Sequence, residues 1–511
     1  MAQPVLNLFA IAARRYSRSR GLGGTAGARG STLSKERAMP SQHLQSNSLN
    51  FTELLAQAVA LISPTMTAAL IVPVMYSNTG DWSWMPYALG TIMLLFVAFN
   101  LNQFARRSAM SGSMYGYICR GLGLTAGAIG GLSLIWAYLG IAIAGVAGFT
   151  IFSGKLLEMM GVHASPYVLS AVCAGLAWFC AWKNVQLSAL MMLVCEGVSM
   201  ALIMLLCGIV LAQHHLAIDT PQFNVSALPW SSVGLGVVVA IFSLVGFECA
   251  TAFGDEAKNP LQTIPKAVNM SLVISGGFFV FVTYVMVMGT RGYSTRLEQL
   301  DAPLNTLAQL AKVPVLQAPL SLGAMISFFA LCLSCINAGS RVIYVMGRHG
   351  LFHAATASAH DKNQTPHIAV SIMVLFAFIV PVIATVNRLT TLDLFNYAGT
   401  CAAFGFMVPY CLITLAAPVY LKSLGQLRTG DLAGCAASLI LLAIPAVGSV
   451  YPLPPAPVMY FPYVFLFYLA LGSVWVFVFH KRKPAASMLI REDLQLHHDS
   501  HQVSGVIAAA E

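Results

Sequence analysis

Charged residues are scarce in this chain of 511 residues. Asp, Glu, Lys and Arg together make up 9% of it and hydrophobic residues 58%, whereas a soluble domain carries about 25% charged residues. No polar stretch between its apolar runs is long enough to form a second folded domain. The composition excludes an ordinary soluble protein and predicts a single domain embedded in a membrane.

The apolar runs have the length of membrane spans. As a helix, roughly 20 apolar residues cross about 30 Å of hydrocarbon. We predict an all-α integral membrane domain of twelve transmembrane helices over residues 51–481, between an N-terminal segment 1–50 and a tail 482–511. The predicted spans are about 54–75, 85–105, 126–151, 166–182, 187–212, 233–253, 268–290, 319–344, 367–386, 394–417, 432–450 and 459–479.

Acidic side chains are almost absent from the predicted spans, where only Glu196 in the fifth and Glu248 in the sixth lie deep. A charged group at that depth is costly, so both are candidate functional residues. No histidine lies deep in a span, and no paired carboxylates occur there at helical spacing. These absences exclude a histidine relay and leave no constellation for catalysis, so we do not expect an enzyme.

The eleven cysteines lie in or beside the predicted spans and do not form the framework of a disulfide-rich protein. Cys332 and Cys335 form a CxxC pair in the middle of an apolar stretch, so we interpret them as small packing residues. His497, His498 and His501 are expected to be solvated side chains of the tail. We predict no disulfide, no metal site and no cofactor.

The net charge of +9 would suit a nucleic-acid partner, but the distribution of the basic residues gives another explanation. With a cytoplasmic N-terminus, most of the 27 Lys and Arg side chains fall in inner segments, and cytoplasmic loops of membrane proteins carry such an excess. We therefore expect no nucleic-acid partner, a multi-pass protein of the plasma (inner) membrane and two cytoplasmic termini. The basic residues of the expected outer loops are Lys155, Arg291, Arg296, Lys312 and Arg388.

The first 38 residues have a different composition. They are rich in Arg, Ser and Gly and contain no acidic residue before Glu36, which is typical of a mitochondrial transit peptide. Alternatively, residues 1–38 over-extend the start of the protein, because the short polar segment that begins at Met39 leads directly into the first span. We favour the second interpretation, and in either case expect segment 1–50 to be cytoplasmic and disordered.

The first and sixth spans are interrupted near their middles by helix-breaking residues. Interruptions at corresponding positions of two halves indicate an inverted repeat with the substrate bound at the breaks. Helices 1–5 would then match helices 6–10, and the last two helices would be additions.

The break in the first span is centred on Ser63-Pro64. Serine is a preferred N-cap and proline is favoured at the first helical position, so a new half-helix is expected to begin here. Its free N–H groups, at residues 65–67, would suit an anion such as a carboxylate. A plain proline kink is the structural alternative. The expected substrate contacts in this break are Ile62, Ser63, Pro64, Thr65 and Met66.

In the sixth span the break is expected across residues 243–246. A helix that ends here leaves carbonyl oxygens unpaired, and these attract a cation such as an ammonium group. Together the two breaks would suit a zwitterionic amino acid with an apolar side chain. The expected contacts in this break are Phe242, Ser243, Leu244, Val245 and Gly246.

Two motifs carry a resemblance to a known family. They are Gly246-Phe247-Glu248 followed by Asp255-Glu256-Ala257-Lys258-Asn259-Pro260 and Ile264-Pro265, and the run Ser340-Arg341-Val342-Ile343-Tyr344-Val345-Met346-Gly347-Arg348-His349-Gly350. The chain thereby resembles the amino acid–polyamine–organocation transporters, with matching stretches over about residues 54–420. The resemblance implies a LeuT-like fold whose two breaks hold the substrate's carboxylate and amine. It also implies that Phe242 covers the substrate and that Glu248 senses protons. The alternative for Phe242 is an aromatic ring that only packs, and the alternative for Glu248 is a carboxyl group bonded to exposed backbone carbonyls.

The chain departs from this family at two places. Ser63-Pro64-Thr65 replaces the usual glycine–small–glycine loop, and some relatives with a proline in the break carry amines rather than amino acids. Glu196 stands where many relatives have a lysine that fills the space of a sodium ion. These departures leave the substrate class and the coupling ion open.

Ionisable residues suggest how transport is coupled and gated. Glu196 and Glu248 could each take up a proton on one side and release it on the other, because buried carboxyl groups can titrate near neutrality. Hydrogen bonding or packing is the alternative for Glu196. Four charged residues are expected to form exposed ion pairs that act as a cytoplasmic gate. Alternatively, these charges only anchor the loops at the cytoplasmic side of the membrane. These are Asp255, Glu256, Lys258 and Arg341.

We therefore expect a secondary active transporter that moves amino acids across the bilayer, coupled to H+ or working by exchange. The alternatives are an amine or polyamine importer and an amino acid sensor on the same fold that does not transport. Its expected partners are a small-molecule substrate, the lipid bilayer and H+ as a possible coupling ion.

Overall fold

The computed structural model describes residues 44, 46–108, 111–183, 185–224, 230–300, 302–449, 451 and 456–482. Expectations for residues 1–43 and for most of the tail, including its three histidines, lie outside the described residues. The helices in chain order are α2 (Phe51–Ile62), α3 (Pro64–Met66), η1 (Thr67–Ile71), α4 (Val72–Thr79), η2 (Gly80–Trp82), α5 (Trp84–Ala105), α6 (Met114–Leu122), α7 (Leu124–Met159), α8 (Pro166–Lys183), α9 (Val185–Gln213), η3 (Thr220–Phe223), α10 (Trp230–Leu244), η5 (Phe247–Ala252), α11 (Pro260–Thr290), η6 (Leu297–Gln299), α12 (Pro303–Leu310), η7 (Pro314–Leu316), α13 (Gln317–Arg348), η8 (Ala354–Ala357), α14 (His367–Val386), α15 (Thr391–Ser423), α16 (Thr429–Gly448), η9 (Val458–Tyr460) and α17 (Phe461–Arg482).

Eleven helical segments among these residues are long and apolar enough to cross a membrane. They correspond to eleven of the twelve predicted spans. The remaining span, predicted at 166–182, is the helix α8 (Pro166–Lys183), which has 18 residues and ends on a lysine. It is not among the eleven, so the all-helical class is confirmed but the count of twelve stays a prediction.

Both predicted helix breaks are present. The helix α2 ends at Ile62, and Ser63 adopts a left-handed conformation before α3 begins at Pro64. A π-helical turn, η1, then leads into α4. In the second broken span, α10 ends at Leu244 and a left-handed Gly246 precedes the 3-10 helix η5.

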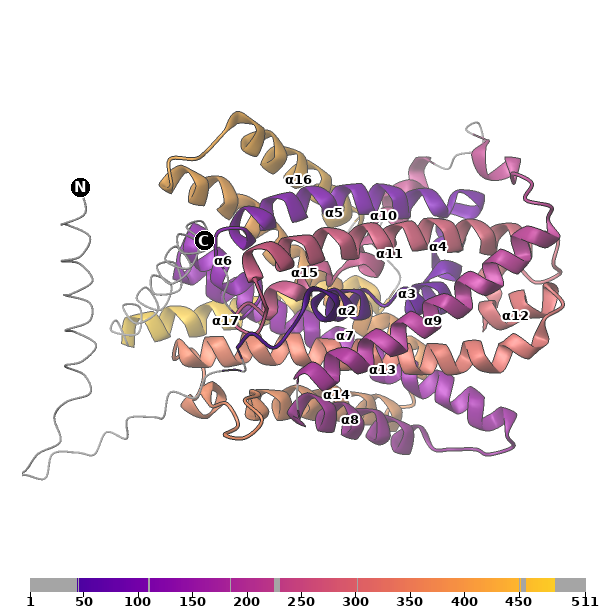
Figure 1. Cartoon of the computed structure of the whole chain (residues 1–511), viewed down its shortest axis with the longest axis horizontal. Coiled ribbons are helices and arrows are strands. Elements are labelled where there is room, and N and C mark those ends of the chain that lie inside the picture. Colours follow the sequence, from indigo (N-terminus) through magenta and orange to yellow (C-terminus); the bar gives the residue numbers. More distant parts are fainter. Residues whose placement is uncertain are drawn as a thin grey trace, which may run out of the picture. The chain divides into compact units, whose positions relative to one another are not determined.

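The two helix breaks lie inside the bundle. In Figure 1, α2 is seen nearly end-on, with α11 above it and α13 below it, and α2 packs against α9, α11 and α13. The helices α5, α10 and α16 form one flank of the bundle, and α8 and α14 form the opposite flank. This arrangement removes both breaks from the lipid-facing surface.

Glycines bring the long helices close together. A Cβ atom added to Gly140 would lie 2.9 Å from the Cβ of Ala402 in α15, and one added to Gly145 would lie 3.0 Å from Cys332 in α13. Small residues permit this approach in a bilayer, where packing replaces the hydrophobic driving force. The glycines of α7 therefore act in packing, and α7 forms the seam between α13 and α15.

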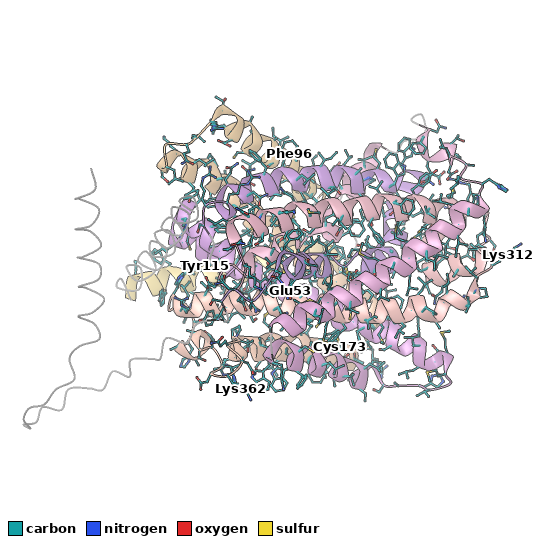
Figure 2. All side chains as sticks on the ribbon, in the orientation of Figure 1. Glu53, Phe96, Tyr115, Cys173, Lys312 and Lys362 are labelled. Carbon is teal, nitrogen blue, oxygen red and sulfur yellow. The ribbon has the colours of Figure 1, made fainter. Side chains whose placement is uncertain are left out.

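The connecting segments gather at two ends of the bundle, as the alternation of spans requires. At one end, Leu49 pairs with Ala257 and Ser111 pairs with Phe253 in short β-bridges. Tyr115 lies at this end and Lys312 lies at the other (Figure 2). We call the end that contains Leu49 and Ala257 the Leu49 face and the end that contains Lys312 the Lys312 face.

Candidate functional site

Ser63 forms the break in the first span, but its side chain does not cap the new half-helix. Its φ and ψ are 49° and 74°, and it is fully buried. The Ser63 hydroxyl lies 3.2 Å from the hydroxyl of Ser327 in α13 and makes no capping bond. The predicted start of the half-helix is correct. The predicted capping by Ser63 is wrong, because its hydroxyl is hydrogen-bonded to Ser327 instead of to the first turn of the half-helix.

The chain's own carboxylate occupies the start of the half-helix. The backbone N–H and the hydroxyl of Thr65 both donate to Glu196 Oε1 at 3.2 Å. Ser327 donates to Glu196 Oε2 at 2.5 Å, and the N–H of Thr67 donates to the Ser63 carbonyl at 3.3 Å. The expectation of free N–H groups at residues 65 and 67 is therefore wrong. The positive end of the half-helix does face a carboxylate, as its dipole favours.

Gly246 brings the two breaks into contact. Its φ of +100° favours glycine, and a Cβ atom here would lie 1.9 Å from Cδ2 of Leu61, which is next to the first break. Both breaks are buried, since Ser63 and Ser243 have no exposed surface and Thr65 is 1% exposed. The breaks therefore form one enclosed region where α2, α3, α10 and η5 meet.

Glu248 lies at the second break in a cage of hydrogen-bond donors. Tyr138 donates to Glu248 Oε1 at 3.0 Å, and Tyr410 donates to Oε2 at 2.7 Å. The N–H of Gly246 also donates to Oε2, at 3.2 Å. A carboxyl group bonded to exposed carbonyls was the structural alternative. It does not describe this geometry, because the recorded partners of the Glu248 side chain are donors.

The sequence did not identify Ser327, Tyr138 and Tyr410 as members of this region. Tyr138 also lies 3.2 Å from the hydroxyl of Ser113. Each is a hydroxyl-bearing residue inside an apolar span, which is the only signal that the sequence offers. Their partners are more than 100 positions away along the chain. Phe242 is only partly buried, and its ring packs against Gly399 of α15.

Two of the four expected gate residues form a buried ion pair near the Leu49 face. The guanidinium of Arg341 binds both carboxylate oxygens of Glu256, at 2.5 and 2.8 Å. It also donates to the Asn337 carbonyl and lies 4.3 Å from the Phe253 ring centroid. The two side chains are 1% and 0% exposed, so the expectation of exposed pairs is wrong here.

The other two expected gate residues contribute through their backbone. The N–H of Lys258 donates to the Leu49 carbonyl at 2.8 Å, and Leu49 in turn donates to the Glu256 carbonyl at 3.0 Å. The N–H of Asp255 donates to Ser111. The loop after the second break is thus tied to the segment before α2, directly beside the Arg341–Glu256 pair. We call this pair with the Leu49–Lys258 backbone contacts the inner cluster.

An outer cluster of charges lies near the Lys312 face. Arg291 donates to Asp81 at 3.1 Å and to Asp219 at 2.8 Å, and so links the ends of α4 and α11 to the segment after α9. Burial lowers the pKa of Arg291, but the hydrogen bonds to the two aspartates outweigh this effect and raise it. The guanidinium therefore stays charged, and the cluster persists while the aspartates are ionised.

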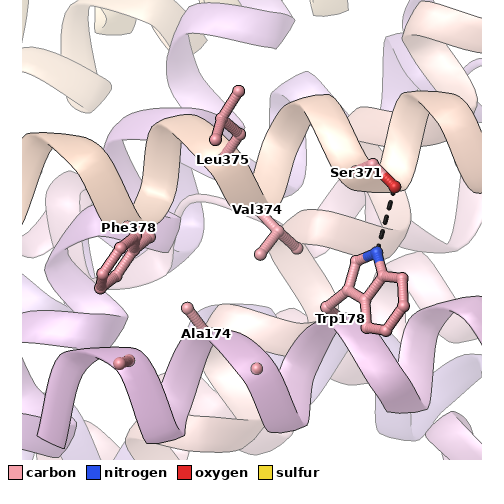
Figure 3. A pocket seen from close by; sticks show the side chains of 8 residues that line it. Ala174, Trp178, Ser371, Val374, Leu375 and Phe378 are labelled. Carbon is pink, nitrogen blue, oxygen red and sulfur yellow. Dashed lines mark hydrogen bonds between the residues drawn. The ribbon is translucent and has the colours of Figure 1, made fainter. Parts of the chain in front are cut away.

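A hollow of about 300 Å³ lies away from the breaks, between α8 and α14 (Figure 3). Trp178 donates its indole N–H to Ser371 at 3.0 Å on one side of it. Leu375, which lines the hollow, is 54% exposed. None of the predicted site residues lines this hollow, and its apolar wall suits a lipid-facing position.

Metal-ligating and nucleophilic groupings do not appear in the described part of the chain. No three His, Cys, Asp or Glu side chains gather there as a possible metal site. In α6, outside the predicted spans, burial raises the pKa of the Cys119 thiol to about 12. Because a thiol reacts as its thiolate, Cys119 is unreactive at neutral pH.

Comparison with known proteins identifies relatives along most of the chain. The sequence model of the amino acid permease family matches residues 55–486. The branched-chain amino acid permease BcaP of Bacillus subtilis (strain 168) is 23% identical over 298 residues, which cover 55% of this chain and 63% of BcaP. The low-affinity putrescine importer PlaP of Escherichia coli (strain K12) is 25% identical over 288 residues, covering 55% of this chain and 62% of PlaP. The chain thus aligns with less than two thirds of the length of either relative.

A solved structure shares the fold. It is a substrate-bound, outward-open Na+-coupled sialic acid symporter, with a TM-score of 0.51 and 12% identity over 80% of this chain and 91% of the symporter. At this identity the likeness concerns the fold alone. The predicted LeuT-like architecture with two broken helices is thereby confirmed.

Proposed function

Because this chain belongs to the amino acid permease family, we propose that it is a secondary active transporter that carries amino acids across the membrane, coupled to H+ or by exchange. The observation that carries this proposal is the contact between the two helix breaks through Gly246 and Leu61. The breaks are enclosed, and each has a buried carboxylate, Glu196 or Glu248, beside it. Enclosed breaks of this kind are where transporters with inverted repeats hold their substrates.

The substrate is proposed to bind between the residues of the two breaks. The N–H of Thr65, once Glu196 releases it, would receive its carboxylate, and the carbonyl ends of α10 would receive its ammonium group. Phe242 is proposed to cover the substrate. The proposed contacts remain Ile62, Ser63, Pro64, Thr65, Met66, Phe242, Ser243, Leu244, Val245 and Gly246.

Proton coupling is proposed to work through competition at Thr65. Glu196 now accepts the N–H and the hydroxyl of Thr65, so a substrate carboxylate and an ionised Glu196 would compete for the same donors. Protonation of Glu196 would weaken these hydrogen bonds and so release the two Thr65 donors for the substrate carboxylate. Each carboxylate that enters would thus require one proton, and Glu248 is the second candidate carrier.

The hydrogen bonds from Thr65 to Glu196 also support a second candidate function, an amine importer. The start of the half-helix already carries the Glu196 carboxylate, and Pro64 supplies no N–H. An amine without a carboxylate would leave Glu196 in place and bind beside its negative charge. The relative PlaP is described as a putrescine importer.

The two charge clusters are proposed to be the gates of this transporter. We assign the inner cluster to the cytoplasm, because most basic residues then lie on the inner side. The N-terminus and the tail would also be cytoplasmic, and the membrane would be the plasma (inner) membrane. The outer cluster around Arg291 would close the opposite side.

Uptake into proteoliposomes tests the proposal. Labelled amino acids and their decarboxylated amines are offered in pairs, such as leucine with isopentylamine and ornithine with putrescine, with and without an inward proton gradient. We expect gradient-driven uptake of amino acids, strongly reduced in Glu196→Gln and in Glu248→Gln. The matched control is Glu298→Gln, which changes a carboxylate in η6, before α12.

Three other results would overturn the proposal. Uptake of amines alone would establish the second candidate. Full proton-driven uptake by both Gln variants would remove the coupling role of the two glutamates. Ligand-induced fluorescence changes without uptake or counterflow would indicate a sensor.

A further inference from the structure

A second pocket lies where α5 ends and α11 begins, apart from the helix breaks. Its volume is about 450 Å³. Figure 1 shows α5 and α11 running side by side, and the two helices pack against each other. The pocket is lined by Arg106, Leu261, Gln262, Pro265, Lys266 and Asn269.

The polar lining of this pocket consists of two cations and two amides. Arg106 and Lys266 are both exposed, and among the described residues neither has an acidic partner within ion-pair distance. The ammonium group of Lys266 lies 4.7 Å from the Phe51 ring centroid. Asn102 donates to Oδ1 of Asn269, which leaves the amide nitrogen of Asn269 as a donor. The lining can therefore donate to an anion, and no carboxylate in it would repel one.

The neighbouring Arg107 likewise has no acidic partner among the described residues, but neutral acceptors hold its guanidinium. Arg107 donates to the carbonyl and side chain of Gln103 and to the side chain of Gln426. Its hydrogen bonds lie outside the pocket. Two adjacent arginines at the end of one helix thus have different surroundings, and only Arg106 is free to bind a ligand.

Exposed apolar side chains follow the pocket along α11. The helix α11 has 31 residues, or about 46 Å at 1.5 Å per residue, so it extends well beyond about 30 Å of hydrocarbon. Lys266, in its second turn, is therefore at the level of the lipid headgroups. Beyond it, Met270, Val273 and Ile274 are 37%, 56% and 37% exposed. Spacings of 4, 7 and 8 residues from Lys266 put these side chains on the same helix face.

We propose that this pocket binds the anionic headgroup of a membrane phospholipid, whose acyl chain lies along Met270, Val273 and Ile274. Arg106 would bind the phosphate in a bidentate manner, and Lys266 would bind it as a point charge. Gln262 and Asn269 would bond to the glycerol or headgroup oxygens. Inorganic phosphate shares the charge but not the apolar chain, so the exposed stripe of α11 favours the lipid. Basic pockets between spans are known to recognise anionic headgroups.

Native mass spectrometry of the full-length protein tests the proposal. The detergent-purified protein is titrated with dioleoylphosphatidylglycerol and, separately, with dioleoylphosphatidylcholine. We expect retained phosphatidylglycerol to fall roughly tenfold or more in the double variant Arg106→Gln/Lys266→Gln, because each basic side chain near a headgroup contributes to anionic lipid binding. Phosphatidylcholine binding is expected to stay the same. The control Arg107→Gln removes one positive charge next to the pocket, and the single variant Arg106→Gln, which removes one charge within it, is its matched counterpart.

Two outcomes would overturn the lipid assignment. Equal retention of phosphatidylglycerol by Arg106→Gln and by Arg107→Gln would show that the pocket is not the site. Displacement of the lipid by millimolar inorganic phosphate would make a soluble anion the ligand. Size-exclusion profiles and Tm values establish that each variant is folded, and the experiment does not depend on transport.

Discussion

The buried carboxylates of this protein are stabilised in two different ways. Glu196 and Glu248 are surrounded by neutral donors, namely hydroxyl and backbone N–H groups. Glu256 is paired instead with the guanidinium of Arg341. A neutral donor can bind a carboxylate without adding a charge, so the group remains able to gain a proton, whereas a bidentate ion pair holds the charge in place. The first arrangement suits coupling and the second suits a gate.

At the scale of single residues, we predict that Tyr410→Phe destabilises the protein more than Tyr468→Phe does. Tyr410 donates to the Glu248 carboxylate at 2.7 Å, whereas Tyr468 donates to the neutral Leu132 carbonyl at 2.9 Å. Hydrogen bonds to charged groups contribute about 1.5–3 kcal/mol and neutral ones about 1 kcal/mol. Thermal unfolding followed by intrinsic fluorescence should therefore give a lower Tm for Tyr410→Phe.

A double-mutant cycle with Glu248→Gln tests the cause of this difference. If the Tyr410 hydroxyl acts through the carboxylate, the effects of the two substitutions will not add. Additive changes in Tm would mean that Tyr410 stabilises the protein by packing instead.

At the scale of helices, the glycines of α7 set the distances to its neighbours. A Cβ atom on Gly148 would lie 2.1 Å from Cδ1 of Phe328, a buried ring of α13. By contrast, Gly197 in α9 has no atom within 4 Å of the corresponding position. Gly148 is therefore required for the close approach of two helices, whereas nothing packs against Gly197, although both are in long helices.

We predict that Gly148→Ala lowers stability by about 1–3 kcal/mol, because overpacking forces α7 and α13 apart. Gly197→Ala is the matched control, and it should be neutral or raise stability by about 0.5–1 kcal/mol, since alanine favours a helix over glycine. Thermal unfolding of both variants in the same detergent measures the difference. Equal Tm values would show that Phe328 can move away without cost.

The helices and their breaks could be predicted from local patterns. Span length follows from hydrophobic runs, and the break at Ser63-Pro64 follows from the backbone chemistry of one short stretch. The partners at the breaks could not be predicted in this way. Glu196 and Thr65 are 131 positions apart, and only the packing of α9 against the broken helix brings them together. For the same reason, the sequence suggested Glu256 and Arg341 as candidate gate residues but could not predict that they are buried as a pair.

At the scale of the whole molecule, clusters of charge lie on both sides of the breaks. The inner cluster contains a buried ion pair, whereas in the outer cluster Arg291 is 38% exposed and its partners Asp81 and Asp219 are 30% and 8% exposed. Removing one partner of a buried pair costs about 3–5 kcal/mol, because the other charge is left unpaired, and exposed pairs contribute about 0–1 kcal/mol. The outer cluster should therefore open more easily than the inner one. In the proposed transport cycle, both clusters would open in turn.

We predict that Arg341→Met makes the region between the helix breaks and the Leu49 face accessible to solvent. Cys249, in η5 between the breaks and the Arg341–Glu256 pair, has no exposed surface. Loss of the ion pair should expose it to N-ethylmaleimide, with an increase of at least roughly tenfold in the labelling rate if about 1.4 kcal/mol of the closure is lost. Peptide mapping by mass spectrometry reports labelling of this one cysteine among the eleven.

Two further variants separate a gate from general destabilisation. Arg291→Met breaks the outer cluster and should leave Cys249 protected, because the inner cluster remains intact. The double variant Arg341→Met/Glu256→Met removes both charges, so it should recover much of the Tm lost in Arg341→Met. Cys249 should nevertheless stay reactive in it, because the bidentate link is absent. If labelling simply followed Tm across the three variants, the Arg341–Glu256 pair would be a stabilising contact rather than a gate.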